Sequence, residues 1–130
     1  MVLVIDPQIA GISGDMLLCS LVDLGADKNK IISGIKQSEK FFPNSTIKKI
    51  DFEKIQKHGV ESLHLVLEID EDIHERKGSE IKSAIIESAQ EIKLSSKATS
   101  FAESCIDTLI SSESTIHGVS EETVHFHEAS

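Results

Sequence analysis

The stretch Ser62-Leu63-His64-Leu65-Val66-Leu67-Glu68-Ile69 alternates strictly between a leucine or isoleucine and a second series of residues. Successive side chains of a β-strand point to opposite faces, so this pattern predicts a strand with one apolar face. His58-Gly59 precedes the stretch, and glycine at such a place favours a tight turn between two strands. We therefore predict a β-hairpin over residues 46–69.

Two further strands are predicted near the two ends of the sequence. The apolar run Val2-Leu3-Val4-Ile5 ends at Asp6-Pro7 and is typical of a strand buried on both faces. The run Val124-His125-Phe126-His127-Glu128 alternates and predicts a last strand. The charged stretch between Glu71 and Lys77 is expected to be a solvated loop.

Apolar residues at helical spacing predict four helices between these strands, with caps at Ser13, Gly25, Asp27, Ser95 and Gly118. In the longest helix, the predicted buried stripe consists of Ala98, Phe101, Ala102, Cys105, Leu109 and Ile116. The order is strand, helices, strand, strand, helices, strand. It predicts an α+β fold of the ferredoxin-like split βαβ type, with a four-stranded antiparallel sheet and helices on one face. We expect residues 1–130 to form a single domain.

Composition excludes several classes of function. A net charge of −9 argues against binding to nucleic acid or to an anionic membrane, and it favours binding of cations. Cys19 and Cys105 both lie in apolar helical patterns, so we expect buried free thiols in a reducing cytosol rather than a disulfide framework. The apolar start is too short for a signal peptide, and no stretch approaches the length of a membrane span. These features predict a cytoplasmic protein.

The last predicted strand carries a candidate metal site. His125 and His127 project to the same face, Glu128 follows, and imidazole with carboxylate suits a divalent transition metal. A polar sheet face that carries histidines is the alternative. In the ferredoxin-like plan the last strand lies beside the first, which would bring both histidines toward Asp6 and Asp15.

The turn Gly11-Ile12-Ser13-Gly14-Asp15 is a second candidate site. Backbone N–H groups at the start of a helix can hold a phosphate or a carboxylate. Asp15 would repel a phosphate unless a metal ion lay between them, and a simple tight connection is an equal alternative. No nucleophile has an adjacent base, so no catalytic residue is assigned. The open, polar sheet face predicts a covering partner, either a second copy in a homo-oligomer or a further domain.

The two motifs together resemble the nickel-insertion proteins (LarC), which help to mature lactate racemase. The resemblance rests on Gly11-Ile12-Ser13-Gly14-Asp15-Met16-Leu17 with Leu24-Gly25, and on His117-Gly118-Val119 with Val124-His125-Phe126-His127-Glu128. It spans nearly the whole chain, including Lys57-His58-Gly59-Val60. It implies a nickel chelatase (cyclometallase) that hydrolyses CTP and inserts nickel into a pyridinium-3,5-bisthiocarboxylic acid mononucleotide.

The resemblance also implies roles for individual residues. Mononucleotide-binding residues would be Gly11, Ser13, Gly14 and Asp15, and nickel ligands would be Asp6, Asp15, His117, His125, His127 and Glu128. For His117, which precedes Gly118 in a predicted helix end, a favourable interaction with the helix dipole is an alternative to metal binding.

Three departures from the family pattern limit what the chain is expected to do. Ile9-Ala10 replaces the usual Phe-Ser, and the single His74 replaces a polyhistidine loop, which argues against metal storage. The sequence ends at Ala129-Ser130, where the family continues into the portion that binds CTP. We therefore expect turnover to need a C-terminal half. Three alternatives stay open: the chain is the first piece of a split protein whose C-terminal half is a separate chain, a diverged stand-alone copy, or a fragment. The competing hypotheses are a non-catalytic ferredoxin-like interaction or oligomerisation module and, with the least support, a self-sufficient metallohydrolase.

Overall fold

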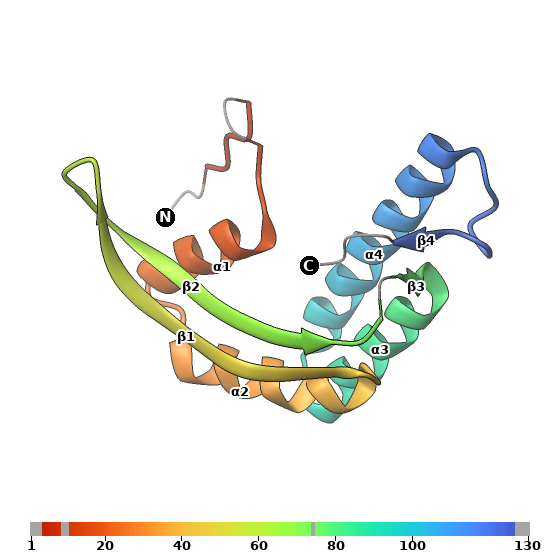
Figure 1. Ribbon diagram of the computed structural model, residues 1–130, viewed down its shortest axis with the longest axis horizontal. Coiled ribbons are helices and arrows are strands. Elements are labelled where there is room, and N and C mark those ends of the chain that lie inside the picture. Colours follow the sequence, from red (N-terminus) through yellow and green to blue (C-terminus); the bar gives the residue numbers. More distant parts are fainter. Residues whose placement is uncertain (1–3, 9–10, 74, 127–130) are drawn as a thin grey trace. The chain divides into compact units, whose positions relative to one another are not determined.

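The computed structural model describes residues 4–8, 11–73 and 75–126 (Figure 1). Its helices and strands, in chain order, are α1 (Gly14–Asp23), α2 (Lys28–Ser38), the short 3₁₀ helix η1 (Glu39–Phe41), β1 (Ser45–Lys57), β2 (Val60–Glu71), β3 (Arg76–Lys77), α3 (Gly78–Glu91), α4 (Ser96–His117) and β4 (His125–Phe126). The fold is α+β, as predicted. None of the described helices is both long enough and apolar enough to cross a membrane.

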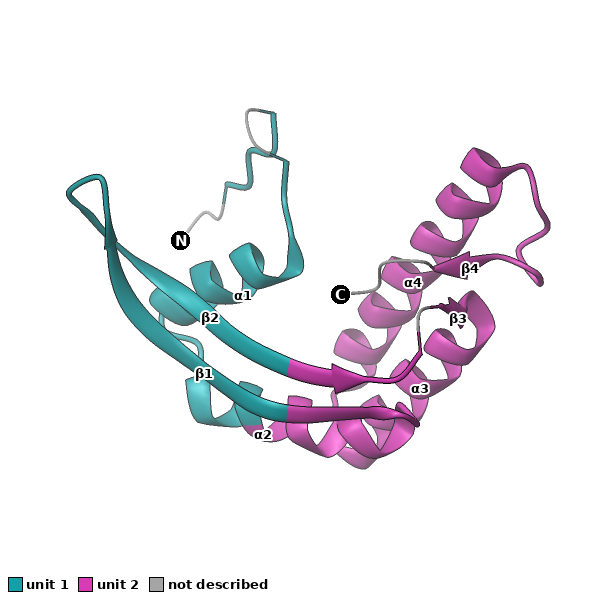
Figure 2. Cartoon of the chain, in the orientation of Figure 1, with its two compact units in different colours: residues 1–32, 48–68 teal, residues 33–47, 69–130 magenta. Residues whose placement is uncertain are grey.

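The chain forms two compact units, which Figure 2 colours separately. Unit 1 comprises Met1–Ile32 with Lys48–Glu68, and unit 2 comprises Ser33–Ile47 with Ile69–Ser130. The helix α2 and both long strands pass from one unit to the other. Each unit therefore draws on segments that are far apart in the sequence.

The predicted hairpin is confirmed as β1 and β2, which pair with each other. Its turn has positive φ at both central residues, 53° at His58 and 80° at Gly59. Such turns match the right-handed twist of the strands that they join. In unit 1 the sheet buries Phe52 and Leu65, and the buried Cys19 of α1 lies near the backbone of Leu65. Burial raises the pKa of the Cys19 thiol.

The predicted four-stranded ferredoxin-like sheet is wrong for the described residues, whose two sheets have two strands each. The last strand, β4, pairs with β3, so that Arg76 lies opposite Phe126 and Lys77 opposite His125. Val4 and Ile5 form no strand and are exposed, whereas Val2 and Leu3 lie outside the described residues. The stretch expected to be a solvated loop therefore contains the partner of β4. A two-residue charged strand is too short to show an alternating pattern.

The core of unit 2 lies between α3, α4 and the residue before β4. Ile81, Ile106, Ile110 and Val124 are buried together, and Phe126 packs against them. The predicted buried stripe of α4 is wrong at four of its six residues. Phe101, Leu109 and Ile116 are 69%, 54% and 74% exposed, and Cys105 is also exposed, whereas Ala98 and Ala102 are half-buried. The helix carries two apolar stripes, and the stripe with more large residues is the one that faces outward.

The predicted helix caps are mostly confirmed. Asp27 Oδ1 accepts hydrogen bonds from the backbone N–H groups of Asn29 and Lys30, at 3.0 and 3.1 Å. Ser95 Oγ accepts one from the N–H of Ala98 at 3.2 Å. Gly118 ends α4 in the left-handed conformation, with φ of 64°. These local signals fix where the helices begin and end.

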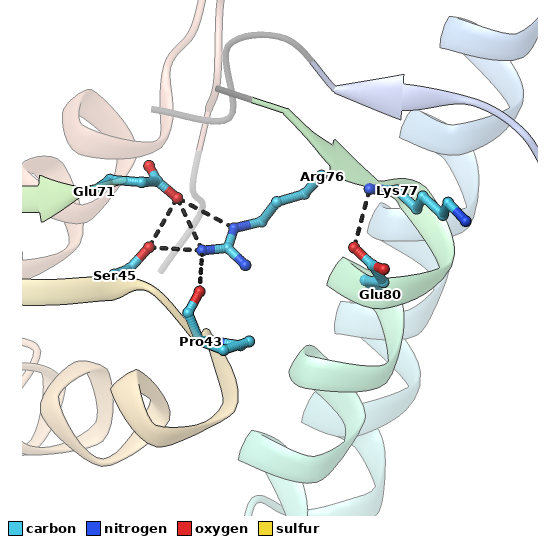
Figure 3. A network of polar contacts seen from close by, with 6 residues as sticks. All are labelled: Pro43, Ser45, Glu71, Arg76, Lys77 and Glu80. Atoms are coloured by element: carbon cyan, nitrogen blue, oxygen red, sulfur yellow. Dashed lines mark hydrogen bonds and ion pairs between the residues drawn. The ribbon is translucent and has the colours of Figure 1, made fainter. Parts of the chain in front are cut away.

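A polar network around Arg76 joins distant segments of unit 2 (Figure 3). Its Nη2 atom donates to Pro43 O at 2.8 Å, to Ser45 Oγ at 2.7 Å and to Glu71 Oε1 at 2.9 Å. Ser45 Oγ in turn donates to Glu71 Oε1 at 2.8 Å. The pKa of Glu71 is lowered, first by the Ser45 hydroxyl and then by Arg76, against an opposing effect of partial burial. The Arg76 side chain is only 11% exposed, so the network compensates a largely buried charge.

Candidate functional site

The turn before α1 places a carboxylate on the start of the helix. Ser13 is the extended N-cap residue, and its hydroxyl donates to Asp15 Oδ1. The backbone N–H of Met16 donates to the same oxygen at 2.8 Å. The Ser13 hydroxyl is the main cause that lowers the pKa of Asp15, and the Met16 N–H and the charge of His64 add to it. Asp15 is therefore ionised at neutral pH, which favours a cation at this turn and disfavours a bare phosphate.

The opening loop forms a hollow beside this turn. Asp6 Oδ1 accepts the N–H of Gln8 at 3.0 Å, and the N–H of Gly11 donates to Pro7 O at 2.9 Å. The hollow has a volume of about 210 Å³, and its lining residues are Val4, Ile5, Asp6, Gly11, Ile12, Met16, Leu17, Ser20, Leu21 and Leu24. Unit 1 thus gathers the predicted residues Asp6 and Gly11 at one apolar hollow.

The alternation predicted for the last strand is confirmed for its described part. Val124 is 1% exposed and Phe126 packs against the core. His125, which lies between them in the sequence, is half-buried. Across the ladder His125 lies opposite Lys77. Side chains at such positions are close neighbours, so a cation bound at His125 needs nearby carboxylates to offset the lysine charge. His127 and Glu128 lie outside the described residues.

His117 lies at the last position of α4, where its Nε2 is 3.3 Å from Glu113 Oε2. A protonated imidazole at a helix C-terminus interacts favourably with the helix dipole, and the carboxylate adds to this stabilisation. This arrangement agrees with the alternative to metal binding, in which His117 interacts favourably with the helix dipole.

The predicted ligands are divided between the two units. Asp6 and Asp15 belong to unit 1, whereas His117 and His125 belong to unit 2. Within the part of the chain that the structure describes, no three His, Cys, Asp or Glu residues gather as a metal site would require. His64, whose charge acts on Asp15 from β2, was not among the site residues predicted from the sequence. Only the packing of α1 near the hairpin reveals this pair, because the two residues are far apart in the sequence.

Comparison with known proteins identifies relatives over nearly the whole chain. The model of the nickel insertion protein family matches residues 3–130. A pyridinium-3,5-bisthiocarboxylic acid mononucleotide nickel insertion protein of Staphylococcus saprophyticus is 37% identical over 119 residues, which cover 92% of this chain and 28% of the relative. A protein of the same name from Thermotoga sp. is 39% identical over 138 residues, covering 98% of this chain and 32% of the relative. A putative nickel insertion protein of Methanothermobacter thermautotrophicus is 27% identical over 128 residues, covering 98% and 30%.

The chain thus spans only 28–32% of the length of these relatives. No solved structure matches it. The match over residues 3–130 includes both motifs described above, the Gly11–Asp15 turn and the histidines at the other end. The chain therefore belongs to the nickel insertion protein family.

Proposed function

We propose that this chain acts in maturation of a nickel-pincer cofactor, in which it binds nickel, the pyridinium mononucleotide, or both. The family match over residues 3–130 is the observation that carries this proposal. The names of the Staphylococcus and Thermotoga relatives specify nickel insertion and that mononucleotide. Nickel is here a substrate that is handed on, not a resident cofactor.

The residues present have the chemistry that such a role requires. Imidazole nitrogen and carboxylate oxygen are suitable ligands for nickel, and we propose Asp6, Asp15, His117, His125, His127 and Glu128 as the ligand set. Asp15 supports this assignment because its lowered pKa keeps it ionised. Of the set, His117 has the weakest support, because Glu113 already contacts it.

The hollow of the opening loop supports a mononucleotide site at Gly11, Ser13, Gly14 and Asp15. A pyridinium ring is flat, partly apolar and positively charged. Apolar walls with Asp6 among them suit such a ring, since the carboxylate offsets its charge. The phosphate would be held by the turn only if a metal ion lay between it and Asp15.

Turnover, in this proposal, needs the part of the family that the match does not include. The chain spans less than a third of its curated relatives, so CTP-dependent chemistry is assigned to the remaining portion. The chain described here would contribute binding and positioning.

Calorimetric titration of the full chain with nickel at pH 7.5 tests the proposal. We expect saturable binding, which a His125→Ala, His127→Ala double variant loses while circular dichroism shows that the fold persists. Binding should weaken as the pH falls toward about 6, because ligand histidines must be neutral. His58→Asn is the matched control: it removes an imidazole from the hairpin turn, and asparagine tolerates the positive φ there.

Absence of saturable binding in the parent chain would contradict the nickel role and favour a non-catalytic interaction module. Equal loss of binding in the His58→Asn control would show that the terminal histidines have no special role. Titration with the mononucleotide, with Asp6→Asn as the variant, tests the second ligand in the same way.

A further inference from the structure

The side of α4 that faces away from the core is apolar and unusually exposed. Phe101, Leu109 and Ile116 are 69%, 54% and 74% exposed, and the exposed Cys105 lies among them at helical spacing. We call these four residues the outer stripe of α4. Helical geometry places them on one face, because successive members are four, four and seven residues apart. An apolar stripe of this length on a solvated helix points to a covering surface.

Beside the outer stripe lie serine and threonine residues whose hydroxyl groups already donate hydrogen bonds within the helix. Ser104, Thr108, Ser112 and Thr115 each donate to the backbone carbonyl four residues earlier, at 2.8 to 2.9 Å. Burying a donor without a partner costs free energy, but these donors keep their partners when another surface covers them. The face can therefore be buried without loss of hydrogen bonds.

Between Phe101 and Leu109 the same side of α4 carries no acidic residue, although the chain carries a net charge of −9. By helical spacing Glu103 and Asp107 lie toward the other side, and Asp107 pairs with Lys82 of α3 at 2.5 Å. Glu113 lies beside the stripe between Leu109 and Ile116, and its carboxylate is 3.3 Å from His117 Nε2. A helix face that stays in water usually carries charges. Their absence between Phe101 and Leu109 is a second feature typical of a face that a protein surface covers.

The area of the stripe distinguishes two candidate partners, a second copy of the chain and a tethered polypeptide. A stripe from Phe101 to Ile116 is about 24 Å long and roughly 10 Å wide, or on the order of 240 Å². A stable interface between separate proteins buries about 800 Å² on each side, so two copies that meet only through this stripe would associate weakly. A polypeptide tethered close to the same helix needs less area, because its effective concentration is high.

The end of the described chain provides such a tether. Phe126 packs against the core cluster that includes Ile106 and Ile110 of α4. In the longer relatives, the polypeptide that follows the matched region would therefore start beside this helix. We propose that the outer stripe of α4 docks a part of the family polypeptide that lies beyond the matched N-terminal region. The inference rests on the proposed function, in which that remaining portion completes the reaction.

Reactivity of Cys105 tests the proposal directly. The full chain is co-expressed with a tagged polypeptide that comprises the part of the Staphylococcus saprophyticus relative outside the match, and both are purified with a chelator present. We expect a one-to-one complex in which a maleimide labels Cys105 about tenfold or more slowly than in the chain alone. Mass spectrometry of the labelled peptides separates Cys105 from the buried Cys19.

A Leu109→Glu variant should weaken the complex by about tenfold or more, since it places a charge in the centre of the stripe. Its side chain is 54% exposed, so the fold should persist by circular dichroism. Val60→Glu is the matched control, because Val60 is a similarly exposed apolar residue on the hairpin, and this variant should bind as the parent does.

Unprotected Cys105 in the complex, or unchanged binding by Leu109→Glu, would overturn the proposal. Protection that grows with the concentration of the chain alone would assign the stripe to a second copy instead. If the partner polypeptide is insoluble, joining both parts in one chain permits the same labelling test, and Cys105 must again be protected. Nickel binding without docking would refute only this inference, and docking without nickel binding would refute only the proposed function.

Discussion

At the scale of single residues, Asp15 shows how much of the candidate site follows from local sequence. The Gly11–Asp15 turn predicts a helix that begins after Ser13 with a carboxylate in its first turn, and both features are confirmed. The hydrogen bonds that Asp15 accepts come from neighbours one and two positions away. Its interaction with His64 depends on packing between distant segments, and no local pattern contains that information.

Replacing Ser13 by alanine should raise the pKa of Asp15 toward its ordinary value of 3.8, because the hydroxyl is the largest cause of the lowering. Since the folded-state pKa lies below the ordinary value, the linked stabilisation exists at neutral pH and is lost as the pH falls through the folded-state pKa. The variant should therefore lose less stability on acidification than the parent. Carboxyl titration followed by NMR measures the pKa. Ser20→Ala, which removes a hydroxyl elsewhere on α1, should leave it unchanged.

At the scale of elements, local sequence patterns predict the long helices and strands but fail for the shortest strands. The hairpin is visible in the sequence because twelve residues of β2 include an alternating run beside a turn. The strand β3 has two charged residues, and only its pairing with β4 defines it. In α4 the helix is predicted correctly, but its buried face is not. Burial there depends on contact with α3 and Val124, through Ile106 and Ile110.

Gly78, where β3 passes into α3, tests the close packing of these short elements. An added Cβ would lie 2.9 Å from Ile110 Cγ1 and 3.2 Å from side-chain atoms of Val124 and Phe126. Gly78→Ala should therefore lower the free energy of unfolding by about 1–3 kcal/mol through overpacking. Gly14→Ala is the control: a Cβ at Gly14 meets nothing within 4 Å, so the helix propensity of alanine should leave stability equal or slightly higher.

Denaturant unfolding followed by circular dichroism measures both glycine variants. Equal stability of Gly78→Ala and the parent would mean that β3, α3 and β4 pack less closely than described here.

At the scale of the whole molecule, sequence motifs identify the family but do not assemble the site. The two motifs that resemble nickel-insertion proteins lie at opposite ends of the chain, and the family match confirms the resemblance. The sequence predicted a four-stranded sheet in which the first and last strands are neighbours, and this sheet would have brought the residues of the two motifs together. The described sheets have a different pairing, in which β4 joins β3. Strand partners far apart in sequence depend on the whole fold, so alternation alone cannot assign them.

The Arg76 network is the clearest long-range polar link in unit 2, since it joins residues from both sides of the hairpin to β3. Arg76→Ala should lower the free energy of unfolding by about 2 kcal/mol, because Glu71 and Pro43 O lose a charged donor in a largely buried place. Lys54→Ala is the matched control. It removes an ion pair with Glu61 whose side chains are 72% and 59% exposed, and such pairs contribute less than about 1 kcal/mol.

Urea unfolding curves of the two variants give this comparison. A smaller loss in Arg76→Ala than in Lys54→Ala would show that the buried network contributes no more than a surface pair.

The pairing of β3 with β4 has a consequence for the order of folding. The two strands enclose all of α3 and α4, so closing this ladder costs much more chain entropy than closing the adjacent strands of the hairpin. The hairpin and the individual helices should form early, whereas β4 becomes ordered only after α3 and α4 have met. His125 would then take its place among the last steps of folding, and a chain still emerging from the ribosome would lack this residue of the proposed nickel site.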